Sequence, residues 1–178
     1  MQPAELKKLK YPIGKFKSPD TIETIHLIKW TDTLETLPTR LNELVKGLSE
    51  KELKLQYRLD GWTIREVVHH IADSHHNSYT RFKWTLTEDT PLIKAYDESA
   101  WAALFDTQNA PIQLSVDYLY ALHAKLVYLI KGLSEEQLQR AFIHPEDHSR
   151  TSLKENIGKY AWHSEHHLAH IKNALATL

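Results

Sequence analysis

The sequence predicts an all-α protein folded as a four-helix bundle with one long crossover connection. Only five glycines and seven prolines interrupt its 178 residues, and the long intervals between them carry apolar residues near helical spacing. No segment shows the period-two alternation of a strand with turn signals on both sides. Four long helices, with a long connection over residues 90–110, are typical of such a bundle.

The first long helix is predicted over residues 22–45, and Pro38 inside it should kink or interrupt it. The second is predicted to begin at Trp62 and to continue to Leu86. Thr63 and Glu66 have the spacing of a capping box, in which each residue bonds the backbone N–H of the other. A well-defined helix start is therefore expected at this point.

The third and fourth long helices are predicted over residues 113–130 and 152–176, and Ser152 with Glu155 forms a second candidate capping box. Residues 46–53 and 131–138 share the sequence Lys-Gly-Leu-Ser-Glu, and each copy follows a long helix. Two interpretations stay open at this point. The chain is either a duplicated helix hairpin, or it uses Gly-Leu-Ser-Glu twice as a helix stop and restart.

Composition narrows the class of protein. Hydrophobic residues make up 42% and charged residues 25%, as in ordinary globular proteins, and we expect a single domain over residues 1–178. Lys and Arg total 22 against 23 Asp and Glu, so no strong field points to nucleic acid or to a membrane surface. No run approaches the length of a membrane span or resembles a secretory signal, so we expect a cytoplasmic location.

Histidines are concentrated on the last predicted helix, at His163, His166, His167 and His170. Residues four apart share a helix face, so His163 with His167 can hold one metal ion. A helical wheel places this pair beside the apolar stripe and His166 almost opposite it, towards solvent. With no cysteine in the chain, any transition metal must be held by histidine and carboxylate. The competing interpretation is that the histidines are merely hydrogen-bonded or exposed.

The second predicted helix offers His69, His70, His75 and His76. His75 falls near the centre of its apolar stripe, whereas His70 lies on a polar flank that could border a cavity. His69 and His76 point mostly away from the core. Periodicity alone does not choose between His70 and His75, and it slightly favours His75 as the more buried residue.

The segment Gly-Trp-Thr-Ile-Arg-Glu-Val-Val-His-His, residues 61–70, resembles the signature of the DinB/YfiT-like superfamily. In that signature a tryptophan at a helix start, here Trp62, is followed eight residues later by a metal-ligand histidine. The second signature, two histidines four apart on the last helix, is matched by His163 and His167. Residues 11–14, 73–75, 81–83, 96–98 and 162–170 resemble the YfiT branch in particular, so the resemblance covers nearly the whole chain.

The resemblance implies a metal site formed by His70, His163 and His167, with zinc or nickel as the ion. It further implies a four-helix bundle, a homodimer and a metal-dependent hydrolase acting on a small molecule. Some relatives instead transfer a low-molecular-weight thiol such as bacillithiol to an electrophile, which makes a thiol S-transferase the alternative enzyme. A third possibility is a non-catalytic bundle that a metal stabilises.

Three imidazoles leave one position of a tetrahedral zinc open, which is the pattern of catalytic sites. That position admits water, whose pKa zinc lowers towards about 7, or a thiol, which reacts as its thiolate. The ligands therefore do not discriminate between hydrolase and transferase. Candidates for a general base or a carboxylate that orients a ligand are Asp73, Asp97, Glu98 and Glu165, and the sequence does not rank them.

Overall fold

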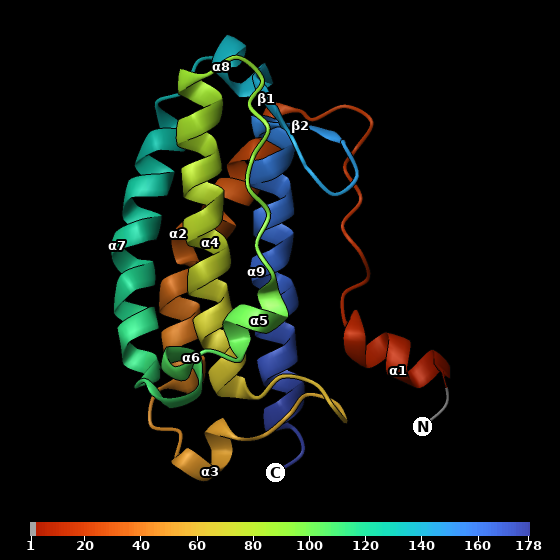
Figure 1. Ribbon diagram of the computed structural model, residues 1–178, viewed down its shortest axis with the longest axis vertical. Helices are drawn as coiled ribbons and strands as arrows, with labels where there is room; N and C mark the ends of the chain where they lie inside the picture. Colours follow the sequence, from red (N-terminus) through yellow and green to blue (C-terminus); the bar gives the residue numbers. More distant parts are fainter. Residues whose placement is uncertain (1–2) are drawn as a thin grey trace.

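The computed structural model describes residues 3–178 and shows a bundle of four long helices (Figure 1). These helices are α2 (Thr24–Val45), α4 (Ile64–Thr87), α7 (Ile112–Lys131) and α9 (Leu153–Leu175). The predicted fold class is confirmed. Residues 1 and 2 of the single domain predicted over 1–178 lie outside the described residues. Short helices lie between or before the long ones: α1 (Pro3–Lys10), α3 (Glu50–Leu53), α5 (Glu98–Ala102), α6 (Phe105–Asn109) and α8 (Glu135–Gln139).

The order of the helices around the bundle differs from their order in the chain. α2 packs against α7 and α9, and α4 packs against the same two helices. Helices that follow each other in sequence, α2 with α4 and α7 with α9, therefore face each other diagonally. The interpretation as two packed helix hairpins is thus wrong. The repeated Gly-Leu-Ser-Glu segments are helix stops, and each serine caps a short new helix, α3 or α8.

The predicted crossover connection joins α4 to α7. It contains α5 and α6, and Figure 1 shows it running back along the bundle before α7 begins. α4 and α7 therefore run in the same direction. A short hairpin would have placed an antiparallel helix after α4, so this long connection is what allows α4 and α7 to pack side by side in the same direction.

The helix ends largely follow the predicted signals. Thr63 caps α4 through the predicted reciprocal bonds with Glu66, at 3.2 Å and 2.7 Å. Ser152 caps α9 by accepting the N–H of Glu155 at 3.2 Å, but the described structure has no return bond from the Glu155 side chain. Of the two expected effects of Pro38, a kink or an interruption, the interruption is wrong, because α2 continues through this residue.

A small β-hairpin precedes α9, and the sequence patterns did not predict it. Its strands β1 (Ala141–Ile143) and β2 (Arg150–Ser152) are antiparallel, with Ala141 opposite Ser152. Each strand has three residues, which is too short for an alternating pattern to stand out. The hairpin lies beside the start of α9 and leads directly into the cap of that helix (Figure 1).

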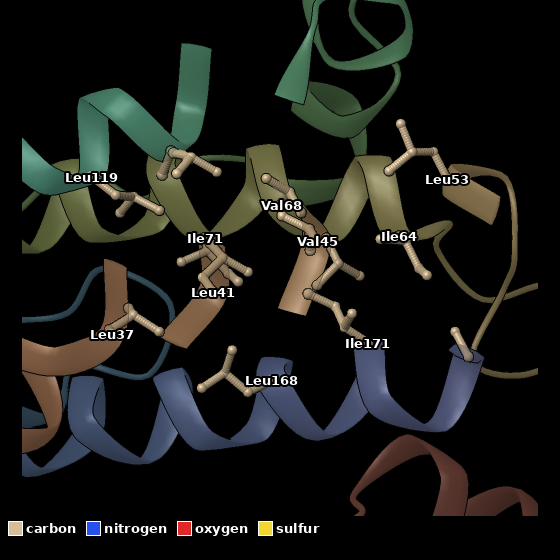
Figure 2. Close-up of a cluster of buried hydrophobic side chains, with 14 of the residues drawn as sticks. Leu37, Leu41, Val45, Leu53, Ile64, Val68, Ile71, Leu119, Leu168 and Ile171 are labelled. Carbon is tan, nitrogen blue, oxygen red and sulfur yellow. The ribbon is translucent and has the colours of Figure 1, made fainter. Parts of the chain in front are cut away.

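Apolar side chains from all four long helices form the core. Figure 2 shows Leu37 and Leu41 of α2 meeting side chains of the other helices, among them Ile71 of α4 and Leu168 of α9. Each of these side chains is at most 2% exposed. Within residues 3–178, no helix is long and apolar enough to cross a lipid bilayer.

Gly158 marks a close approach between α9 and α2. A Cβ atom at this position would lie 2.8 Å from ring carbon Cη2 of Trp30. We therefore expect Gly158→Ala to lower the free energy of unfolding by about 1–3 kcal/mol, the usual cost of overpacking, although alanine has the higher helix propensity. Urea unfolding of purified protein measures this difference.

Gly132→Ala is the matched control, because a Cβ atom there would meet nothing nearer than 3.6 Å. Its free energy of unfolding should stay within about 0.5 kcal/mol of the unsubstituted protein. Equal stability of the two variants would contradict the close packing of α9 on Trp30.

Candidate metal centre

Three histidines predicted as metal ligands come together between α4 and α9. One ring nitrogen each from His70, His163 and His167 can be chosen so that all three lie within 4.8 Å of one another. The Nε2 atoms of His70 and His163 are 3.2 Å apart. His70 is 4% exposed and His167 is 6% exposed, whereas His163 is half-buried.

Local helix geometry produces this convergence. His163 and His167 are one turn apart on α9, and their ring centroids are 4.4 Å apart. His70 approaches from α4, with its ring centroid 4.7 Å from that of His167. Trp62, just before α4, packs against the His70 ring, with the ring centroids 4.6 Å apart.

Burial keeps these imidazoles neutral. Burial, together with the nearby His166 and His170, lowers the pKa of His70 to about 3. Burial likewise holds the pKa of His163 and of His167 well below the ordinary value. A neutral imidazole has a free lone pair and is the form that binds metal. Three such donors fit zinc, nickel or copper better than a hard cation such as magnesium.

His75 lies behind the group rather than in it. Its side chain is fully buried, as the helical wheel predicted, and its Nε2 lies 3.1 Å from Nδ1 of His163. The Nε2 atom of His163 faces His70, so His75 contacts the opposite side of the His163 ring. The structure thus brings His70, and not His75, together with the pair on α9.

Sequence reasoning missed His123 on α7. It is 1% exposed, and its Nε2 lies 3.0 Å from Nδ1 of His75. Its own Nδ1 lies 2.6 Å from the carbonyl oxygen of Leu34 on α2. His123 occurs among Leu119, Leu122 and Leu126 on the apolar face of α7, and a histidine in such a position was the available signal.

A second histidine group lies next to the first. His166, His167 and His170 also offer ring nitrogens within 4.8 Å of one another. The expectation that His166 faces solvent is wrong: it is 7% exposed, because Trp162 stacks on it at 4.6 Å and Tyr11 covers it at 6.1 Å. His167 belongs to both groups, and a neutral imidazole has one lone pair, so the groups are alternatives for His167.

A cavity of about 720 Å³ reaches the metal-site group at His163. Tyr160 and Arg81 lie beside His163 in its wall. Of the predicted acidic candidates, Asp97 and Glu98 line this cavity. Partial desolvation, followed by the nearby Glu146, raises the pKa of Glu98, although its side chain remains exposed at the surface. His144, from the hairpin, also lines it. The cavity is large enough for a small-molecule substrate.

The other two acidic candidates are placed differently. Glu165 accepts a bond from Nη2 of Arg40 at 2.8 Å, and this pairing lowers the pKa of its carboxyl group. Asp73 does not line the cavity, and burial raises its pKa to about 6. The structure therefore favours Asp97 and Glu98 over these two as groups that can meet a substrate.

Comparisons with known proteins agree with this architecture. A family model described as the DinB superfamily matches residues 33–171. A candidate metal-dependent hydrolase of Oceanobacillus iheyensis is 46% identical over 162 residues, which cover 91% of this chain and 93% of the relative. The candidate metal-dependent hydrolase YfiT of Bacillus subtilis is 44% identical over 163 residues, 92% of each chain. A solved structure of YfiT, described as a four-helix bundle of unusual topology, matches with a TM-score of 0.93 and 42% identity over 96% of this chain and 97% of that one.

The buried histidines predict a steep acid sensitivity of the metal-free protein. The folded-state pKa is about 3 for His70 and about 4 for His123, against 6.5 for an ordinary histidine. Unfolding therefore takes up protons as the pH falls below 6.5. Each such proton lowers the free energy of unfolding by about 1.4 kcal/mol per pH unit. Stability should be full above this pH and be lost progressively down to about pH 3, the lower of the two folded-state pKa values.

Urea unfolding in the presence of EDTA, measured at several pH values, tests this prediction. The urea concentration at the midpoint of unfolding should fall with decreasing pH. The corresponding loss of free energy should indicate that several protons are taken up on unfolding. A free energy of unfolding that stays constant between about pH 6.5 and 4.5 would show that these histidines are not buried in the neutral form.

Proposed function

The chain belongs to the DinB superfamily, and on this premise we propose that it is a metal-dependent hydrolase that acts on a small molecule. The observation that carries the proposal is the convergence of His70, His163 and His167 beside a cavity of about 720 Å³. Relatives 44–46% identical to this chain are themselves candidate metal-dependent hydrolases, which supports the same reaction class.

The proposed ligands are His70, His163 and His167, and the proposed ion is zinc or nickel. When bound, the metal would supply Lewis acidity for activating water. The protein contributes the rest of the site. Burial keeps the three imidazoles neutral, and the cavity lets a substrate approach the group from the His163 side. Glu98 lines the same cavity with a raised pKa, so we propose it as the proton-transferring group.

Metal analysis of protein purified without an affinity tag tests the centre. We expect about one equivalent of zinc or nickel in the unsubstituted protein and a loss of most of it in His70→Ala and His167→Ala. His76→Ala is the matched control, because His76 is exposed, lies on α4 like His70, and belongs to neither histidine group. It should retain the full equivalent.

The outcome also separates the two histidine groups. Retention of metal in His70→Ala together with its loss in His166→Ala would place the ion at the second group and overturn the ligand assignment. Metal-loaded protein is then screened against esters and amides with and without an added thiol. Turnover with water alone supports the hydrolase, and turnover that requires the thiol would identify a transferase instead.

A further inference from the structure

A chain of hydrogen bonds links the proposed metal centre to the backbone of α2. From Nδ1 of His163 on α9 it passes to His75 on α4 at 3.1 Å and to His123 on α7 at 3.0 Å. It ends at the carbonyl oxygen of Leu34 on α2, 2.6 Å from Nδ1 of His123. All four long helices thus contribute one member. Leu34, His75 and His123 are buried, and His163 is half-buried where the cavity reaches it.

The direction of this chain follows from its last member. A carbonyl oxygen only accepts, so Nδ1 of His123 carries the proton. In a neutral ring Nε2 of His123 then has the lone pair, and it accepts from Nδ1–H of His75. By the same reasoning Nε2 of His75 accepts from Nδ1–H of His163. The lone pair of His163 is consequently on Nε2, the atom that faces His70.

Pro38 explains why the Leu34 carbonyl is available. In a helix this oxygen would accept the N–H of residue 38, four positions later, and proline has no N–H. The carbonyl is therefore left without its usual donor inside a continuous helix, and His123 supplies the missing bond. A buried acceptor without a donor would be unfavourable, so His123 and Pro38 are matched to each other.

We propose that His75 and His123 are positioning residues, which fix the Nδ1–H tautomer of His163 so that its Nε2 lone pair faces the metal centre. Pro38 is the third member of this device, because it frees the carbonyl that sets the direction. The expected effect on metal binding rests on the metal centre proposed above. The tautomers themselves do not depend on it, because they exist in the metal-free protein. The two ideas can therefore fail separately.

NMR of the histidine rings in metal-free, ¹⁵N-labelled protein is the direct test. We expect His163, His75 and His123 all to be neutral Nδ1–H tautomers, with Nδ1–H of His123 hydrogen-bonded. An Nε2–H tautomer at any of the three positions would overturn the proposal. This result does not depend on whether the protein later binds a metal.

Variants test the consequence for metal binding. His123→Phe and His75→Phe should weaken zinc affinity roughly 10–100-fold, as removal of a partner behind a ligand usually does. His76→Phe, on the exposed side of α4, is the control and should keep the affinity. Equal affinity in all three variants would contradict a positioning role for His75 and His123.

Pro38→Ala separates positioning from packing. Alanine restores an N–H that competes with His123 for the Leu34 carbonyl, and it is also the better helix former. We expect a metal-free variant with a raised melting temperature, a disturbed Nδ1–H signal for His123 and weaker zinc binding. An unchanged Nδ1–H signal of His123 and an unchanged zinc affinity, in a more stable variant, would show that Pro38 plays no part in positioning His163.

A second inference rests on a different observation, which concerns Arg81 in the wall of the cavity beside His163. Arg81 of α4 is 7% exposed and donates from Nη1 to the hydroxyl of Tyr160 at 3.3 Å. Its Nε is buried and has no hydrogen-bond partner, and among the described residues Arg81 forms no ion pair within 4 Å. The carboxylate of Glu98 compensates the charge only from a distance, since Arg81 partly offsets the rise in the pKa of Glu98 but forms no ion pair with it. A buried cation without a direct anionic partner is unfavourable, and its planar donors suit a carboxylate or phosphate.

The other charged groups of the cavity lie nearer to solvent. Asp97 and Asp147 are exposed and already accept backbone N–H groups, of Ala100 and Ser149 respectively. Three further charged residues of the lining, all exposed, are Glu98, Glu146 and Lys159. The buried charge on the cavity wall is therefore positive, while the mouth is mainly acidic.

We infer that Arg81 binds an anionic group, a carboxylate or a phosphate, of the substrate. This inference deepens the proposed function by naming a class of substrate. The test uses metal-free protein, so that the metal itself cannot attract the anion. Titration with succinate and with inorganic phosphate should shift the ¹⁵Nε signal of Arg81 saturably for at least one of them, while succinamide should not.

Arg81→Gln should abolish this anion binding, measured by the signals of residues around the cavity. Lys83→Gln is the control, because Lys83 is an exposed cation of α4 that does not line this cavity. Binding that survives in Arg81→Gln, or no saturable binding to the unsubstituted protein, would overturn the inference. Neither result would affect the metal analysis described above.

Discussion

The neutral histidines buried in the bundle are the constraint on which the rest of the site depends. Each imidazole brings one N–H and one lone pair into a core where an unbonded polar group is costly. His163, His75 and His123 meet this requirement by bonding to one another. Because burial excludes the charged form, which has no lone pair, the chain of bonds has one possible direction. One acceptor, the carbonyl of Leu34, determines that direction.

The unusual order of the helices makes this chain possible. In a simple up-and-down bundle each helix would pack against its neighbours in sequence. The helices α4 and α9 would then lie diagonally opposite each other and would not pack together. Here α4 packs against both α7 and α9. His70 and His75 can therefore both reach α9, and His75 can reach α7 as well. The diagonal arrangement of the helices thus serves the metal centre as well as the fold.

Much of the architecture could be predicted because its signals are local. Apolar spacing gave the four long helices, and Thr63 with Glu66 gave the start of α4. The spacing of His163 and His167 predicted their convergence on α9. Periodicity did not choose His70 over His75, since both are buried, and only the resemblance to a family made that choice. The ligand role of these residues and the homodimer stay predictions.

What could not be predicted depends on contacts between distant segments. His166 is buried because the N-terminal segment covers it, and no wheel drawn for α9 alone contains that information. Pro38 is the clearest case. Within one helix a proline indicates a break, because it removes a bond and costs about 3 kcal/mol. Here the acceptor it frees is taken by His123 of another helix, so part of that cost is recovered in the core. In the proposed chain of hydrogen bonds, Pro38 thus connects the backbone of α2 to the proposed metal ligand. This role arises only when the helices are packed together, so the sequence of α2 alone does not reveal it.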